Sequence, residues 1–336
     1  MSPSRLMVKS SLWVCLTILT AGCVQRSAGP ELREIALVDT AGWAHDIALD
    51  GKDLYVADRQ GGFALFEGRE FGSPPRVAVP VTDIISLASS TGRVLLAARF
   101  EGLVLASKSG TVLARLANGD IANAVETRGD LAYVAYGLHG LVIARVRESG
   151  ISLVSELPSP GWAHGLKLSG DRVFVADWNY GLRAVDIADP ARPVEIGVLP
   201  TPATTIAVSL HQQPGRLMAA LAEGHAGVAL VEFDAQGHPA LLARNALGLN
   251  PKDNPHPEAG GWVHGVAWSG EYLFAANWKR GLDVLDVRDV RHPRLVLERP
   301  TTGTALAVVA EQQSDGSHLV FLADGEAGLR VFRFAP

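Results

Sequence analysis

Short apolar runs that alternate with polar positions recur along most of the chain, and glycine-rich turns separate them. The clearest copies are GWAHDIALDGKDLYVADRQGGFALF from Gly42, GWAHGLKLSGDRVFVADWNYGLRAVDI from Gly161 and GWVHGVAWSGEYLFAANWKRGLDVLDV from Gly261. Within each copy two runs of period two are joined by a turn, and a third run follows a glycine. The pattern predicts a repeated set of three short β-strands, here called A, B and C.

Weaker copies of the same set span residues 83–106, 123–146, 204–233 and 304–334, which makes seven copies. A glycine stands between strands B and C in every copy: Gly62, Gly102, Gly140, Gly181, Gly227, Gly281 and Gly328. The spacing of 38 to 54 residues between these glycines is typical of four-stranded propeller blades. The sequence therefore predicts an all-β fold, a seven-bladed β-propeller over residues 32–336.

A fourth apolar stretch follows strand C in six copies, as residues 194–199 do in the fourth. The seventh copy has none, because the chain stops at Pro336. Residues 32–38 (LREIALV) precede the first copy in the same way that residues 194–199 precede a later one. We expect this N-terminal strand to complete the last blade, which would remove an exposed sheet edge.

The first 22 residues differ from the repeats. Arg5 and Lys9 precede an apolar run at residues 11–21, which is too short to span a bilayer and is typical of a signal peptide. The run ends in Leu19-Thr20-Ala21-Gly22-Cys23, which resembles a bacterial lipoprotein signal peptide, although that family usually has an aliphatic residue at the position of Thr20. An ordinary secretory peptide or an uncleaved anchor is the alternative.

The resemblance implies cleavage after Gly22 and a diacylglyceryl group on the sulfur of Cys23, with residues 1–22 as the signal peptide and 23–31 as a tether. Val24 follows the cysteine, and the same resemblance then favours the outer membrane; the face of the membrane stays open. Because Cys15 leaves with the peptide and Cys23 is acylated, no thiol remains for redox or nucleophilic chemistry.

Charge excludes one class of partner. The 336 residues carry a formal net charge of -5, which becomes -7 when the peptide with Arg5 and Lys9 is removed. Such a chain offers no basic surface to neutralise a phosphate backbone, so we expect no nucleic-acid partner.

Two segments resemble a known repeat. Residues 174–177 (FVAD), 181–187 (GLRAVDI) and Asp189-Pro190 form one, and residues 282–287 (LDVLDV) form the other. They are similar to the LVIVD-repeat β-propellers of bacteria and archaea. The resemblance implies a propeller over residues 32–336 but no activity, since binders, scaffolds and enzymes share this fold.

Polar residues occupy the predicted first position of strand A in every copy. They are His45, Asp83, Asn123, His164, Thr204, His264 and Thr304. Aliphatic residues stand two positions later: Ile47, Ile85, Val125, Leu166, Ile206, Val266 and Leu306. Because strand A is the innermost strand of a blade, we expect the polar set to ring the mouth of the channel and to bind a ligand.

A second set stands at the end of strand B, four residues before each glycine. It comprises Asp58, Ala98, Tyr136, Asp177, Glu223, Asn277 and Asp324. The aspartates are interpreted as caps of the B–C turn, whereas Glu223 departs from the repeat and is a candidate for ligand binding.

Tryptophans and one insertion add candidates on the same face. Trp43, Trp162 and Trp262 are expected to pack between blades. Trp178 and Trp278, in B–C loops, are suited to stacking on a sugar or anchoring a protein. The insertion 245–260 brings His256 toward the mouth.

Two hypotheses for the function remain. The first is a lipid-anchored, non-enzymatic propeller of the bacterial envelope that binds a protein, small molecule or glycan through the channel mouth. The alternative is an envelope enzyme with an acid/base or divalent-metal centre built from His45, Asp83, His164 and His264. We expect no metal, because these histidines come from non-adjacent copies and a seven-bladed channel would hold them apart. No catalytic residue is assigned, since the chain has no G-x-S-x-G or P-loop motif.

Overall fold

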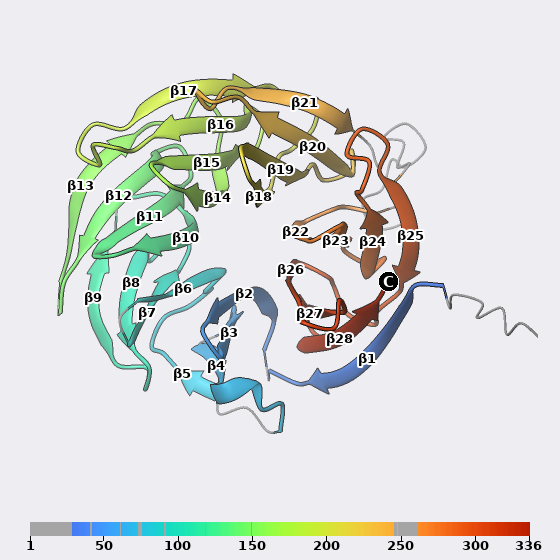
Figure 1. The fold of residues 1–336 in the computed structure, drawn as a ribbon. Coiled ribbons are helices and arrows are strands. Elements are labelled where there is room, and N and C mark those ends of the chain that lie inside the picture. The colour runs from blue at the N-terminus through green and yellow to red at the C-terminus, as the bar shows by residue number, and fades with distance from the viewer. Residues whose placement is uncertain are drawn as a thin grey trace, which may run out of the picture.

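The fold consists of seven four-stranded antiparallel sheets. Figure 1 shows the sheets arranged in a ring. The computed structural model describes residues 29–336 except 41, 61, 73–75, 91, 118, 149, 245–246 and 248–260. The predicted seven-bladed β-propeller is confirmed. The N-terminal candidate Cys23 and the loop candidate His256 lie outside the described residues.

Each of the first six blades runs outward from the channel in chain order. Blade one comprises β2 (Ala44–Asp50), β3 (Asp53–Asp58), β4 (Gly62–Phe66) and β5 (Arg76–Ala78), with a 3-10 turn η1 (Glu67–Arg69) before β5. Blade two comprises β6 (Ser86–Ser90), β7 (Arg93–Ala97), β8 (Leu103–Ser107) and β9 (Val112–Leu116). Blade three comprises β10 (Ala122–Arg128), β11 (Leu131–Tyr136), β12 (Gly140–Val146) and β13 (Ile151–Leu157).

The remaining blades repeat this plan. Blade four comprises β14 (Ala163–Ser169), β15 (Arg172–Asp177), β16 (Gly181–Asp186) and β17 (Val194–Leu199). Blade five comprises β18 (Ala207–Gln213), β19 (Arg216–Ala222), β20 (Val228–Phe233) and β21 (Pro239–Arg244). Blade six comprises β22 (Gly265–Ser269), β23 (Tyr272–Ala276), β24 (Leu282–Asp286) and β25 (Arg294–Arg299). Blade seven contains β26 (Ala307–Gln312), β27 (His318–Ala323) and β28 (Leu329–Ala335).

The outermost strand of blade seven is β1 (Glu31–Val38), which pairs antiparallel with β28 and lies beside it in Figure 1. The β1–β28 register shifts between Glu34 and Ala36, so Ile35 is an extra residue on the outer strand. The outer strands β9, β13, β17, β21 and β25 have the same one-residue shift against their inner neighbours. The N-terminal strand β1 thus has the same one-residue bulge as the outer strands of blades two to six.

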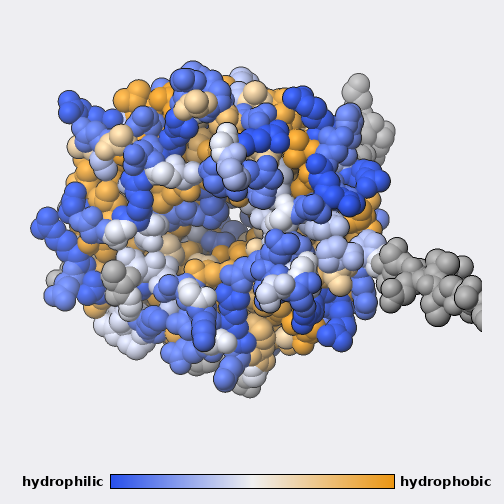
Figure 2. All heavy atoms as spheres, in the orientation of Figure 1, coloured by the Kyte–Doolittle hydropathy of each residue, from blue (hydrophilic) through white to orange (hydrophobic). Residues whose placement is uncertain are grey.

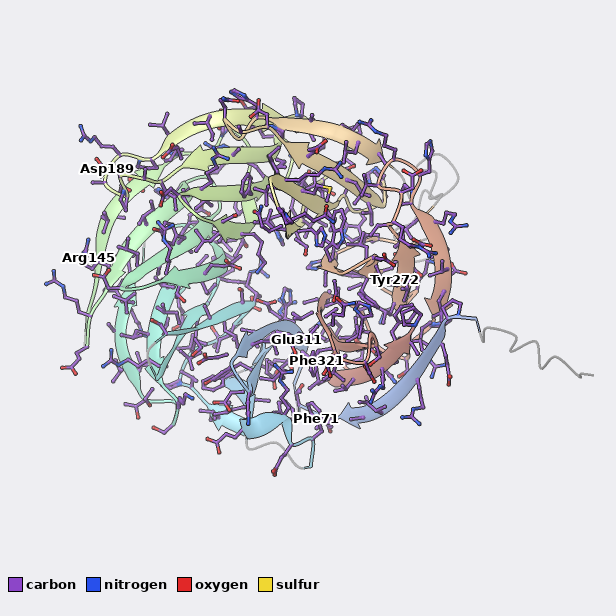
Figure 3. All side chains as sticks on the ribbon, in the orientation of Figure 1. Phe71, Arg145, Asp189, Tyr272, Glu311 and Phe321 are labelled. Atoms are coloured by element: carbon purple, nitrogen blue, oxygen red, sulfur yellow. The ribbon has the colours of Figure 1, made fainter. Side chains whose placement is uncertain are left out.

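The core lies between blades rather than inside any one of them. Strands B and C are buried on both faces, and each apolar cluster joins side chains of two neighbouring blades. Between blades seven and one, Phe71 packs on Phe321 with ring centroids 6.1 Å apart. Figure 3 labels both residues. Arg69 pairs with Glu311 at the same contact. This packing makes the ring a rigid frame for the residues at its centre.

No helix of the described part of the chain is long and apolar enough to cross a membrane.

Candidate functional site

The histidines of three blades stand at one level of the channel. Backbone pairing defines this level. In each of the three blades, the residue after the histidine pairs with the strand B residue that directly precedes Asp58, Asp177 or Asn277. The pairs are Asp46 with Ala57, Gly165 with Ala176 and Gly265 with Ala276. By the same criterion the seven residues of this level are His45, Ile85, Asn123, His164, Ile206, His264 and Leu306. The predicted alignment is therefore off by two residues in blades two, five and seven, where Asp83, Thr204 and Thr304 precede the level.

The three imidazoles converge across the channel. The ring centroids of His45 and His264 are 5.6 Å apart, and those of His164 and His264 are 5.9 Å apart. All three rings are partly exposed and line a central cavity of about 450 Å³. Figure 2 shows the molecule hollowed at its centre, with hydrophobic residues inside a largely hydrophilic rim. The expectation that the channel would hold these rings far apart is wrong.

Each imidazole is held by the backbone of the next blade. Nδ1 of His45, His164 and His264 lies 2.8, 3.1 and 3.0 Å from the carbonyl oxygens of Ile85, Ile206 and Leu306, respectively. A carbonyl oxygen only accepts, so Nδ1 carries the hydrogen in all three rings. Among the described residues this is the one hydrogen bond of each ring. Nε2 is therefore left as an acceptor that faces away from the blade wall.

Glycine follows two of the three histidines, where the next blade comes close. A Cβ on Gly165 would lie 2.6 Å from the Ile206 carbonyl oxygen, and one on Gly265 would lie 2.6 Å from the Leu306 carbonyl oxygen. In these two blades a side chain would collide with the neighbouring carbonyl, whereas His45 makes the same bond at 2.8 Å with Asp46 after it. The close approach of the next blade therefore accounts for glycine after His164 and His264, but the Nδ1 bond itself does not depend on glycine.

The three rings are neutral. Burial lowers the pKa of His164 to about 3 and that of His264 to about 4, and it holds the pKa of His45 well below its usual range. The nearby His264 ring lowers the pKa of both other histidines further. Together with the Nδ1 hydrogen bonds, this leaves three unprotonated Nε2 atoms at the channel.

The other predicted ring residues hold the loops above the histidines. Asp83 lies between two guanidinium groups, 2.7 Å from Nε of Arg59 and 3.3 Å from Nη1 of Arg99. The Oγ1 of Thr304 donates to Glu326 at 2.9 Å, and the Nδ2 of Asn123 donates to the Ala163 carbonyl at 2.8 Å. Thr204 packs against Gly224, where a Cβ would lie 2.6 Å from the Thr204 Oγ1.

The set at the end of strand B is buried, and its aspartates accept hydrogen bonds from the backbone just before strand A. Asp58 accepts from the Trp43 backbone N–H at 2.8 Å, and Asp324 accepts from Gly303 at 3.2 Å and from Arg330 at 2.6 Å. The predicted capping bond two residues ahead exists at Asp58, but it is long, with Gln60 N at 3.4 Å. The principal partners of these aspartates are therefore the connections between blades.

Glu223 also belongs to this buried set. Its side chain has no exposed surface, and its Oε2 lies 3.1 Å from Nη1 of Arg244. Burial raises the pKa of Glu223 to about 7, although Arg244 opposes the rise. The side chain does not reach the open mouth where the sequence pattern placed it.

The B–C loops form the mouth above the histidines. The ring of Trp178 lies 5.3 Å from that of His164, and the ring of Trp278 lies 6.1 Å from that of His264. Trp43 of blade one packs against Gly325 of blade seven, and Trp262 of blade six packs against Gly224 of blade five. Both contacts are the blade-to-blade packing that the sequence predicts. A second hollow of about 620 Å³ is lined by Trp43, Arg59, Gln60, Thr82 and Asp83.

Two large side chains of the mouth stand in a backbone conformation that favours glycine. The residue that follows the set at the end of strand B has a positive φ in five blades and bridges to the next blade. Three of these residues are glycines, Gly137, Gly224 and Gly325, but the other two are Arg99 (φ 35°) and Trp278 (φ 45°). Such residues cost of order 1–3 kcal/mol each and cluster at functional sites.

Two exposed apolar residues of the mouth were not predicted from the sequence. Phe100 is 73% exposed and Leu138 is 57% exposed, at the tips of the B–C loops in neighbouring blades two and three. Their position two residues after the end of strand B was visible in the repeat alignment. It predicts a solvent-facing loop tip, where a large apolar side chain is unusual.

Within the described ranges, no group of three or more His, Cys, Asp or Glu side chains is placed so that it could hold a metal ion without side-chain movement. The channel histidines are residues of a type that binds transition metals. Asp83, the fourth residue of the predicted centre, forms ion pairs with Arg59 and Arg99 instead.

The fold and channel define the protein as a seven-bladed β-propeller. It carries LVIVD repeats: that family matches residues 41–65, 160–201 and 260–301, which cover strands and turns of blades one, four and six. No curated protein matches the sequence.

Solved structures show the same architecture. The β-propeller domain of Cps50 (Swd1) from Myceliophteria thermophila is similar, with 11% identity, a TM-score of 0.70, and coverage of 91% of this chain and 100% of that one. The computationally designed Ika8 protein is similar with 10% identity, a TM-score of 0.59, and coverage of 89% and 99%. At these identities the likeness shows the fold alone.

Proposed function

We propose that the protein is a lipid-anchored β-propeller of the bacterial envelope that binds a partner through the channel-mouth face. The lipoprotein-like sequence ending at Cys23 supports the anchor and the compartment. Acyl chains on Cys23 would tether the propeller to a membrane through residues 23–31. A propeller with LVIVD repeats is compatible with a binding or scaffold role.

The observation that carries the binding face is the side-chain content of the B–C loops. Arg99 and Trp278 occupy left-handed positions where three other blades use glycine, so the fold alone does not require these side chains. Phe100 is exposed immediately beside Arg99, and its ring lies 5.4 Å from the Arg99 guanidinium carbon. Loops that vary on a rigid frame are the usual position of binding residues.

The chemistry of the mouth favours a partner with aromatic or apolar groups and an acidic group. Phe100, Leu138, Trp178 and Trp278 supply apolar contact area, while Arg59 and Arg99 share the single carboxylate of Asp83. Aromatic and arginine side chains dominate the binding energy of most protein interfaces. A protein surface is therefore the partner class that this face fits best.

Site-specific photo-crosslinking in the native host tests this proposal. A photoreactive amino acid is placed at Phe100 or Leu138 on the mouth face, and at Lys52 or Asp171 on the opposite face. All four positions are exposed loop or hairpin residues, so the two pairs are matched controls. We expect the same discrete adduct from both mouth positions and none from the opposite pair.

Trp278→Gly provides the second arm of this experiment. The substitution removes the indole at a position where glycine suits the backbone, so the blade should fold. We expect the adduct from Phe100 to fall at least several-fold in this variant. Equal adducts from both faces, or adducts from the opposite face alone, would contradict the proposed binding face.

A further inference from the structure

The channel histidines have the organisation of a metal-ligand set, which goes beyond the proposed binding role. Transition metals in proteins are commonly held by neutral imidazoles whose second nitrogen donates to a backbone carbonyl or carboxylate. That bond fixes the tautomer and the orientation of the ring. All three histidines meet this condition through Ile85, Ile206 and Leu306, so each presents Nε2 to the channel.

Two of the three ring separations, those to His264, are close to what one ion requires. With metal–nitrogen bonds of 2.0–2.1 Å, two imidazoles on one ion at a ligand angle of about 103° have ring centroids about 5 Å apart. The observed separations of 5.6 Å for His45–His264 and 5.9 Å for His164–His264 exceed this value slightly. Small side-chain rotations would bring the rings inward, since all three are partly exposed to the cavity rather than packed on every side.

Apolar and polar side chains both surround the three imidazoles. The level is completed by Ile85, Ile206 and Leu306, whose side chains are buried and apolar, and by Asn123. Trp178 and Trp278 cover His164 and His264 from the mouth. The 450 Å³ cavity leaves room for the ion and for water or a small ligand beside it. The cavity wall also carries Asp46 and the Glu126–Lys167 ion pair, so polar as well as apolar groups would surround a bound ion.

From these observations we propose that Nε2 of His45, His164 and His264 together bind one divalent transition-metal ion on the channel axis. The blade positions indicate which ions fit. Blades one, four and six are separated by about 154°, 103° and 103° around a seven-bladed ring. Three nitrogens with this spread lie nearly in one plane with the ion, as square-planar and tetragonal ions prefer. Cu²⁺ and Ni²⁺ have that preference, whereas Zn²⁺ favours a tetrahedron.

Titration of the metal-free, untagged full chain with Cu²⁺ tests the proposal. Calorimetry should give one equivalent of bound ion, and electron paramagnetic resonance should show three nitrogen ligands. Since loss of an outer hydrogen bond alone weakens metal sites 10–100-fold, His264→Gln should weaken binding at least about 100-fold. The control is His238→Gln, which changes an exposed histidine that pairs with Asp234. This variant should bind as the parent does.

A second variant separates a lost ligand from a lost fold. His45→Gln/His164→Gln should reduce the nitrogen count from three to one while circular dichroism stays unchanged. Failure to bind Cu²⁺ or Ni²⁺ at micromolar concentrations would overturn the proposal. So would a one-equivalent site of unchanged affinity in His264→Gln, or three nitrogen ligands that remain in the double variant. Either result leaves the proposed binding face intact, because the crosslinking positions are in the loops.

Discussion

Replacing Arg183 with methionine is expected to lower the free energy of unfolding by about 3–5 kcal/mol, the range for removing one partner of a buried ion pair. Arg183 lies in strand C of blade four and is only 2% exposed. Its Nε donates to Glu195 on the outer strand at 2.5 Å, and its Nη2 donates to the Pro158 carbonyl of blade three at 3.2 Å. Its Nη1 lies 3.5 Å from Asp177, which has no exposed surface.

Chemical denaturation of Arg183→Met and its controls measures this effect. Arg192→Met, which removes an exposed arginine paired with Asp189, should change stability little. The triple variant Asp177→Asn/Arg183→Met/Glu195→Gln should recover part of the loss, because it no longer buries unpaired carboxylates. A loss in Arg183→Met no greater than in Arg192→Met would show that the buried network does not stabilise the blade.

Deleting β1 is expected to destabilise blade seven and to expose the edge of β28. Leu32 and Val38 are buried, and burying two such side chains contributes about 3–6 kcal/mol. Glu34 of β1 accepts from Arg330 at 2.9 Å, and Arg330 also donates to Asp324. This triad repeats that of Glu195, Arg183 and Asp177 in blade four. The deletion would therefore also leave a buried arginine without one of its partners.

Thermal melting and size-exclusion chromatography report the consequences. A chain that begins at Gly42 should melt at lower temperature and associate through the exposed edge of β28. A chain that lacks only residues 1–29 is the matched control and should melt as the parent does. A synthetic peptide of residues 30–40 should restore the melting temperature of the shorter chain. A deletion chain as stable and monomeric as the control would contradict a structural role for β1.

The blade count was predictable because glycine marks a required turn in every copy. Gly181 and Gly281, for example, have φ of 103° and 89°, and a Cβ there would collide with a backbone carbonyl. The buried B and C strands preserve their apolar pattern for the same packing reason in every blade. The strand count also identified residues 32–38 as the remaining outer strand, and these residues lie in β1.

The register at the channel was harder to predict. In blades two, five and seven the residue at the channel level is aliphatic rather than histidine. A polar residue stands two positions earlier, and a sequence alignment matches that residue to the histidines. Asp83, Thr204 and Thr304 therefore aligned with the histidines although the hydrogen-bond ladder places Ile85, Ile206 and Leu306 there. Only backbone pairing distinguishes two registers that differ by two residues, because both keep the same alternation.

The convergence of the histidines could not be predicted from their spacing along the chain. It depends on how the closed ring of blades brings copies one, four and six together across the channel. Similarly, the repeat pattern does not show that Arg99 and Trp278 adopt positive φ. The one sign of this conformation in the sequence is that three other blades have glycine at the corresponding loop position.

The central claim is that this propeller is an anchored envelope protein, and the compartment decides which partners can reach its mouth. Intact-protein mass spectrometry of the membrane fraction from the native host tests it most directly. We predict a mature chain that begins at Cys23 and carries the added mass of a diacylglyceryl group and an amide-linked acyl chain, with Cys23→Ser released from the membrane fraction. A mature chain that begins elsewhere, or an unmodified Cys23 in a soluble fraction, would contradict the claim.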